Sequence, residues 1–197
     1  MKTKAIRIAL MLAVANALLA SRVNGETNER WSSGALGLYP AWEYPGECCD
    51  VKWIRLDLLA GRHGNVYGVD LGTIMNMCDK SCVGVQFAGV CNVVGESALS
   101  AQFAGACNYT HRYSKGIQLA AVNWADEDFS GLQMGMFNCA GAFRGLHVGV
   151  LNSAESGGGV QLGVVNVSGE FTGVQLGLLN VNLSSGVPVL PLVNMMF

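Results

Sequence analysis

An apolar-rich segment that begins at a small residue and ends at asparagine recurs nine times along this chain. Two clear copies are Gly159–Asn166, which reads GVQLGVVN, and Gly173–Asn180, which reads GVQLGLLN. A short period maintained over many copies indicates a repeat architecture, in which each unit packs only against its neighbours. The copies end at Asn76, Asn92, Asn108, Asn123, Asn138, Asn152, Asn166, Asn180 and Asn194, spaced by 16, 16, 15 and 15 residues and then by 14.

A second column of polar residues accompanies the asparagines. Eight of the nine copies carry a polar side chain two residues after the leading small residue, and Pro188 takes that place in the ninth. These eight residues are Asp70, Gln86, Gln102, Gln118, Gln133, His147, Gln161 and Gln175.

The local pattern favours strands over helices, because glycine interrupts every copy and Val and Ile are common. Apolar and other residues alternate over 160–164, slip at Val165–Asn166, and alternate again over 167–171. Each 14-residue unit therefore predicts two five-residue strands joined by two-residue turns. Asn and Gly tolerate left-handed backbone and are expected at the corners. The predicted fold is all-β, a parallel β-solenoid with coils of 14–16 residues.

Equivalent residues of successive coils are expected to lie about 4.8 Å apart. The nine asparagines would then form a corner ladder, with their side-chain amides bonded to one another. Val160, Leu162 and Val164 are expected to face the core from one sheet, and Val167 and Phe171 from the other. The eight polar residues would form an exposed ladder on the outer face of the first sheet.

Seven cysteines are present, and an odd number leaves at least one thiol unpaired or bonded between chains. Cys91 and Cys107 each directly precede a corner asparagine, so stacking would bring their Cα atoms within disulfide range. They are the candidate disulfide. A free thiol packed as a small apolar residue is the expectation for Cys139.

Residues 1–25 have the form of a signal peptide, with a basic start, an apolar run over 8–20 and small residues before Glu26. A retained anchor is the alternative. Cleavage would remove four of the 12 basic residues and none of the 14 acidic ones, leaving a net charge of −6. Such a chain lacks the positive charge for nucleic acid, and no later segment is long enough for a transmembrane helix.

The mature chain is predicted to comprise an irregular segment over 26–50 and a repeat domain over 51–197. Residues 51–59 predict a capping strand with Ile54, Leu56 and Leu58 facing inward. At the other end, Pro188 and Pro191 would hinder strand addition, but the apolar tail suggests contact within the chain or end-to-end self-association.

The repeats resemble those of the leptospiral-type surface repeat proteins of bacteria, whose copies read Gly-Leu-Gln-Leu-Gly-Leu-x-Asn. The resemblance spans roughly residues 52–194, including the lead-in over 54–62 and the first copy from Gly68. His147 and Pro188 in place of Gln, and Ala120 in place of the second Gly, depart from the pattern. The resemblance implies a bacterial protein exported to the cell surface or outer membrane, and no catalytic activity.

No arrangement typical of catalysis, cofactor binding or metal binding is present. The three histidines, His63, His111 and His147, lie in different coils without a carboxylate at matching spacing. The acidic run Asp126-Glu127-Asp128 is interpreted as a solvated turn, although its oxygens could suit weak calcium binding. We therefore expect a non-enzymatic protein with a structural or interaction role, whose partner is an unknown protein or surface matrix.

Two other functions compete with this interpretation. A small outer-membrane β-barrel would account for export and alternation, but its strands need about 9–11 residues and the alternation here breaks after five. A solenoid enzyme that cleaves polysaccharides would need paired carboxylates in one column, and none is found.

Overall fold

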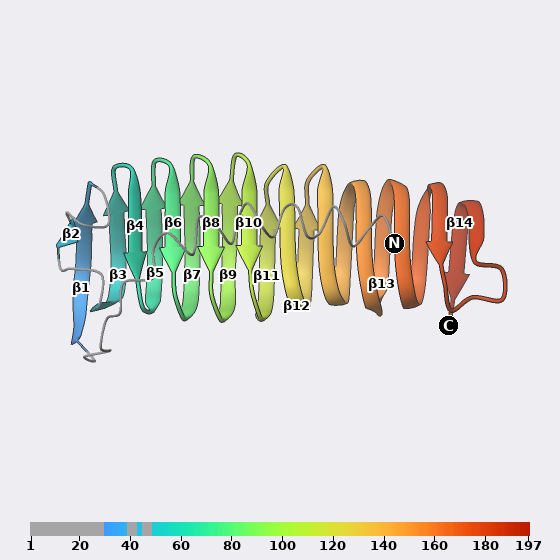
Figure 1. Ribbon diagram of the computed structural model, residues 1–197, viewed down its shortest axis with the longest axis horizontal. Helices are drawn as coiled ribbons and strands as arrows, with labels where there is room; N and C mark the ends of the chain where they lie inside the picture. The colour runs from blue at the N-terminus through green and yellow to red at the C-terminus, as the bar shows by residue number, and fades with distance from the viewer. Residues whose placement is uncertain (1–29, 39–42, 45–48) are drawn as a thin grey trace.

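The strands of this chain wind into a stack of coils along one axis, as Figure 1 shows. The structure is a computed structural model that describes residues 30–38, 43–44 and 49–197. The expected signal peptide lies outside the described residues, as do 26–29, 39–42 and 45–48 of the segment 26–50. Every element within the described ranges is a strand, and no helix there could span a membrane.

Each coil contributes one strand to each of two parallel sheets. The glutamine sheet, named for its central residue, contains β3 (Cys49–Asp57), β5 (Val66–Gly72), β7 (Ser81–Ala88), β9 (Ser97–Ala104) and β11 (Tyr113–Leu119). The asparagine sheet contains β4 (Ala60–His63), β6 (Met75–Cys78), β8 (Cys91–Val94) and β10 (Cys107–Thr110). The last coils run around their corners without a break as β12 (Val122–Met134) and β13 (Phe137–Asn182).

Repeat positions pair in register from coil to coil. Asn92 lies beside Asn76 and Asn108, and Gln102 lies beside Gln86 and Gln118. All pairings between successive coils are parallel, which selects the solenoid from the architectures that the sequence left open. The period shortens through a register shift between Ala125 and Asp128, where the β12 strand carries one residue more than β13.

The N-terminal end differs from the prediction for residues 51–59. These residues do form a strand, β3, but β3 and β4 make the first coil instead of the cap. Beyond the first coil, β1 (Arg30–Gly37) pairs parallel with β3, and β2 (Glu43–Tyr44) pairs antiparallel with β1 at the edge of the sheet.

The ninth copy does not form a coil. Instead β14 (Val189–Met196) folds back and pairs antiparallel with β13, which places Asn194 beside Gln175. The backbone N–H of Asn182 donates to the carbonyl of Pro188 at 2.8 Å and closes this reversal. Pro188 and Pro191 lack the N–H groups that a further parallel strand would need.

The prediction of the inward face of the glutamine sheet is wrong. Val164 is 43% exposed, and Val160 and Leu162 are half-buried on the outer side, whereas Gln161 is buried. The same holds in β3, where Ile54 and Leu56 are exposed and Arg55 is buried, and Leu58 beyond it is also exposed. Alternation with a period of two identifies two faces but does not say which of them is inside.

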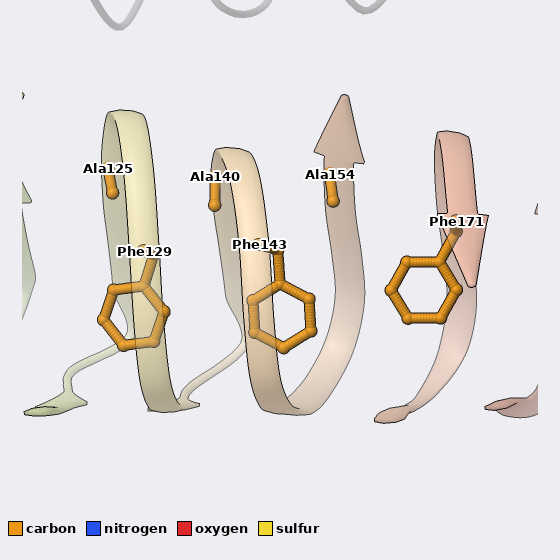
Figure 2. Packing of buried hydrophobic residues seen from close by; sticks show 6 residues of the cluster. All are labelled: Ala125, Phe129, Ala140, Phe143, Ala154 and Phe171. Atoms are coloured by element: carbon orange, nitrogen blue, oxygen red, sulfur yellow. The ribbon is translucent and has the colours of Figure 1, made fainter. Parts of the chain in front are cut away.

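The apolar core is thin and changes along the stack. Its C-terminal part holds a column of stacked rings, in which Phe143 lies 6.4 Å from Phe129 and 6.3 Å from Phe171 between centroids (Figure 2). Phe171 therefore faces inward as predicted. Small side chains such as Ala140 lie opposite the rings, and in the N-terminal coils Cys78, Cys82 and Val94 fill the same space.

The recurring glycines and asparagines have different roles in the coil. A glycine two residues before the ladder position has positive φ in most coils, for example 131° at Gly84 and 140° at Gly131. The asparagines do not adopt positive φ, because Trp53 and Leu192 are the only non-glycine residues with positive φ in the described ranges. These glycines lie within strands such as β7 and β12 and not at the predicted glycine corner, so they supply backbone freedom inside the strand, whereas asparagine is needed for its side chain.

Candidate functional site

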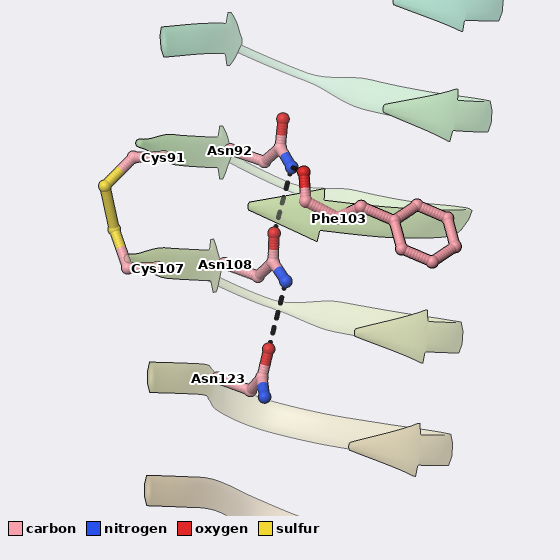
Figure 3. Close-up of a disulfide and its surroundings, with 6 residues drawn as sticks. All are labelled: Cys91, Asn92, Phe103, Cys107, Asn108 and Asn123. Carbon is pink, nitrogen blue, oxygen red and sulfur yellow. Dashed lines mark hydrogen bonds between the residues drawn. A yellow bond between two sulfur atoms is a disulfide. The ribbon is translucent and has the colours of Figure 1, made fainter. Parts of the chain in front are cut away.

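Asparagine side chains form a continuous hydrogen-bonded ladder at one corner. Seven Nδ2–Oδ1 hydrogen bonds of 2.8–3.0 Å join the eight asparagines from Asn76 to Asn180. Many of these amides also donate to a backbone carbonyl, as Asn92 does to Phe103 at 3.0 Å (Figure 3). The predicted corner ladder is confirmed for these eight residues and wrong for Asn194.

The second ladder lies inside the solenoid, contrary to the prediction that it is exposed. All eight members are at most 1% exposed: Asp70, Gln86, Gln102, Gln118, Gln133, His147, Gln161 and Gln175. Buried amides are stable only when hydrogen-bonded, and stacking in register provides the partners. Nε2 of each of Gln102, Gln118 and Gln133 donates to Oε1 of the preceding glutamine at 2.7–2.8 Å.

A carboxylate sets the direction of this inner ladder. Asp70 can only accept, so Gln86 must present Nε2 to it, and the 3.0 Å hydrogen bond leaves Oε1 of Gln86 for the next glutamine. The amides as far as Gln133 are thereby oriented with their donors towards the N-terminal end. The asparagine ladder runs the opposite way, with each donor directed towards the C-terminal end.

A buried ion pair closes the N-terminal end of the inner ladder. Arg55 donates through Nε and an Nη to both oxygens of Asp70 at 2.6 Å, and its Nε lies 2.9 Å from Asp57. Burial disfavours the guanidinium charge, but the two carboxylates outweigh that effect and raise the pKa of Arg55. Because all three side chains are buried, this charged cluster stabilises the ladder and is closed to a substrate.

His147 interrupts the inner ladder. Its ring lies 3.6 Å from that of Phe143 between centroids, and burial lowers its pKa to about 3. Within the described residues, neither ring nitrogen of His147 has a hydrogen-bond partner, and Oε1 of Gln133 and Nε2 of Gln161 also lack one. The ladder resumes at Gln161, which accepts from Gln175 at 2.8 Å.

The outward side of the glutamine sheet is apolar. In every coil the residues on either side of the ladder position are apolar and none is buried. We call these two columns the apolar face. It consists of Ile54, Val69, Val85, Ala101, Ile117, Leu132, Leu146, Val160 and Val174, and of Leu56, Leu71, Phe87, Phe103, Leu119, Met134, Val148, Leu162 and Leu176.

The apolar face continues onto both end strands. Leu36 of β1 lies beside Leu56, and Met195 and Val193 of β14 lie beside Val174 and Leu176. Two aromatic rings, those of Phe87 and Phe103, stack 4.8 Å apart on it. A groove of about 490 Å³ at the N-terminal end is lined in part by Leu36, Leu56, Leu71 and Phe87. Sequence reasoning missed this surface because it assigned these side chains to the core.

Cys91 and Cys107 form the predicted disulfide, with their Cα atoms 4.7 Å apart (Figure 3). Cys78 and Cys82 are buried free thiols, and burial raises the pKa of Cys78 to about 12, which makes it a poor nucleophile. Cys139 is half-buried.

Asp126, the first residue of the acidic run 126–128, lies at the centre of a polar cluster near the surface. Asp126 accepts hydrogen bonds from Tyr109 at 2.5 Å and Trp124 at 2.6 Å, and its Oδ2 lies 2.8 Å from Nδ1 of His111. Burial and this carboxylate raise the pKa of Tyr109. The oxygens of Asp126 are thus already engaged, and the described part of the chain contains no group of three or more His, Cys, Asp or Glu placed to hold a metal.

No family model, no curated protein and no solved structure matches this chain. The assignment of a function therefore depends on the repeat, the fold and the surfaces described above.

Proposed function

We propose that this protein is an exported, non-enzymatic repeat protein with a structural or interaction role at the bacterial cell surface. The observation that carries the proposal is the apolar face, which extends over every coil from β3 to β13. Monomeric soluble proteins rarely expose an apolar patch of this extent, and such patches mark contact with a partner. The partner surface, a protein or a surface matrix, would cover this face.

The buried chemistry supports a non-enzymatic role. Arg55, Asp57 and Asp70 neutralise one another inside the solenoid, and His147 packs against Phe143. These are the groups that an active site would expose to a substrate.

The sequence supports export. Residues 1–25 have the pattern of a cleaved leader, and the resemblance of the repeats to leptospiral-type surface proteins points to the same compartment. A disulfide between Cys91 and Cys107 is compatible with an oxidising compartment outside the cytoplasm.

Expression of the chain with its own leader in a Gram-negative bacterium tests the proposal. We expect a mature N-terminus near Glu26 by mass spectrometry, and digestion of the protein by protease added to intact cells. A variant with Leu10→Arg and Leu12→Arg in the apolar run is the control and should remain uncleaved inside the cell. Cytoplasmic retention of the unaltered chain would refute export, and hydrolysis of a glycan panel by the purified protein would refute the non-enzymatic role.

A further inference from the structure

The apolar face has the dimensions of a protein–protein interface. With the small residues that flank its two columns, the strip runs from two residues before to two residues after the ladder position. Nine strands at about 4.8 Å and these five residues at about 3.3 Å each give roughly 43 Å by 17 Å. This amounts to about 700 Å² on each copy and about 1,400 Å² in a pair, within the range of stable complexes. Two sheets that pack face to face keep their strand directions within about 30° of each other, and a second copy of this face can meet that condition along its whole length.

From these dimensions we propose that two copies of this chain dimerise through the apolar face. This inference rests on the proposed function, because the second copy would be the partner that covers the face. The interface is isologous, so one two-fold axis relates the two copies. That axis lies in the interface and runs either parallel to the strands or along the solenoid.

Charge on the edge of the face selects between the two axes. The column three residues before the ladder position lies along the edge of the apolar face. Lys52, Lys115 and Arg144 carry exposed basic side chains in this column, and residues such as Tyr67 and Ser130 lie beside them. An axis parallel to the strands reverses the order of the coils. Gln118 is the fifth of nine ladder positions counted from Arg55, so Lys115 would then face Lys115 of the second copy.

An axis along the solenoid avoids this repulsion and pairs large with small side chains. This axis keeps equivalent coils of the two copies opposite each other. The apolar column that precedes the ladder residue then lies opposite the apolar column that follows the ladder residue in the second copy. Ala101 then faces Phe103 of the second copy, Val85 faces Phe87, and Ile117 faces Leu119. Lys115 faces Ala121 of the second copy, beyond the edge of the apolar face, where no like charge opposes it.

Sedimentation velocity of the purified chain, without detergent and at micromolar concentration, tests the dimer. We expect a dimer for the unaltered chain and at least a tenfold weaker association for Ile117→Lys. Leu183→Lys is the matched control, because Leu183 is 67% exposed but lies in the turn after β13, away from the face. Circular dichroism must show that all variants keep the strand content of the unaltered chain.

A mixing experiment tests the choice of axis, with equimolar amounts of an Ile117→Lys chain and a Leu119→Glu chain. An axis along the solenoid places the introduced lysine of one copy opposite the introduced glutamate of the other, so we expect association to return. The axis parallel to the strands would not bring these two substituted positions together, and failure of the mixture to associate would overturn our arrangement.

Three other results would overturn the dimer. These are a monomeric unaltered chain, a dimer that Ile117→Lys leaves intact, and a monomer that instead floats with vesicles of phosphatidylglycerol, which would assign the face to lipid. An exported monomer would refute the dimer alone. A dimer retained in the cytoplasm would refute the proposed localisation alone.

Discussion

Single amides decide the stability of this solenoid, because glutamines such as Gln102 and Gln118 are both donors and acceptors for their neighbours. A buried hydrogen bond contributes about 1 kcal/mol, whereas a buried group left without a partner costs about 1–3 kcal/mol. The inner ladder is therefore stable as a complete column and sensitive to the loss of any member.

At this scale we expect Gln118→Leu to lower the free energy of unfolding by about 2–5 kcal/mol, since it orphans Oε1 of Gln102 and Nε2 of Gln133. Chemical denaturation followed by circular dichroism measures the change. Ile117→Leu, one residue away on the outer side, should stay within about 0.5 kcal/mol. Equal stability of the two variants would contradict the role of the ladder.

His147 is the position where the column can be improved. A glutamine there would supply the donor that Oε1 of Gln133 lacks and the acceptor that Nε2 of Gln161 lacks. We therefore expect His147→Gln to raise the free energy of unfolding at pH 7 by about 1–3 kcal/mol. A lower unfolding midpoint for this variant would show that the contact of His147 with Phe143 matters more.

The same histidine makes stability depend on pH. The pKa of His147 is about 3 in the folded chain and about 6.5 when unfolded, so the unfolded chain binds more protons between these values. Stability is then full above about pH 6.5 and falls by up to about 1.4 kcal/mol per pH unit down to pH 3. Unfolding midpoints at pH 7 and pH 5 should differ more for the unaltered chain than for His147→Gln. Equal differences would exclude His147 as the cause.

At the scale of the strand and its corner, the glycine column sets how closely coils approach. A Cβ at Gly131 would lie 2.0 Å from the carbonyl oxygen of Gly116, and φ is 140°. We expect Gly131→Ala to destabilise the protein by about 2 kcal/mol or more. At Gly186 a Cβ would meet nothing within 4 Å, so Gly186→Ala is the control and should have little effect on thermal unfolding.

The disulfide joins two neighbouring strands, β8 and β10. It closes a loop with a sequence separation of 16, and such a loop corresponds to about 3 kcal/mol in the chain-entropy account. A Cys91→Ser, Cys107→Ser double variant should lose about that amount in chemical denaturation, and reductant should affect only the unaltered chain. Peptide mass analysis that finds both thiols free in the non-reduced protein would disprove the bond.

At the scale of the whole molecule, the ends determine whether the solenoid stays finite. An uncovered coil offers a row of unpaired N–H and C=O groups to any other strand. Antiparallel β14 covers the last coil, and β1 with β2 covers β3, the glutamine-sheet strand of the first coil.

We expect a chain truncated after Leu183 to associate end to end, because the edge formed by residues 173–182 becomes free. Light scattering and electron microscopy would detect the resulting oligomers. Removal of Phe197 alone, which is 93% exposed, is the control and should not change the particle size. A truncated chain that sediments as the full-length chain does would contradict the capping role of β14.

The repeat predicted the solenoid, a column of nine asparagines of which eight form the ladder, and Cys91 and Cys107 as the candidate disulfide. Copies in register must stack equivalent residues, so these features follow from spacing alone. Only the tertiary structure decided which side of each strand is inside. Alternation is symmetric, and Gln161 is buried in preference to Val160 because its amide finds a partner in the neighbouring coil. Asn194 lies beside Gln175 for a different reason: the chain reverses at Pro188, and the antiparallel pairing of β14 with β13 depends on contacts that no local pattern records.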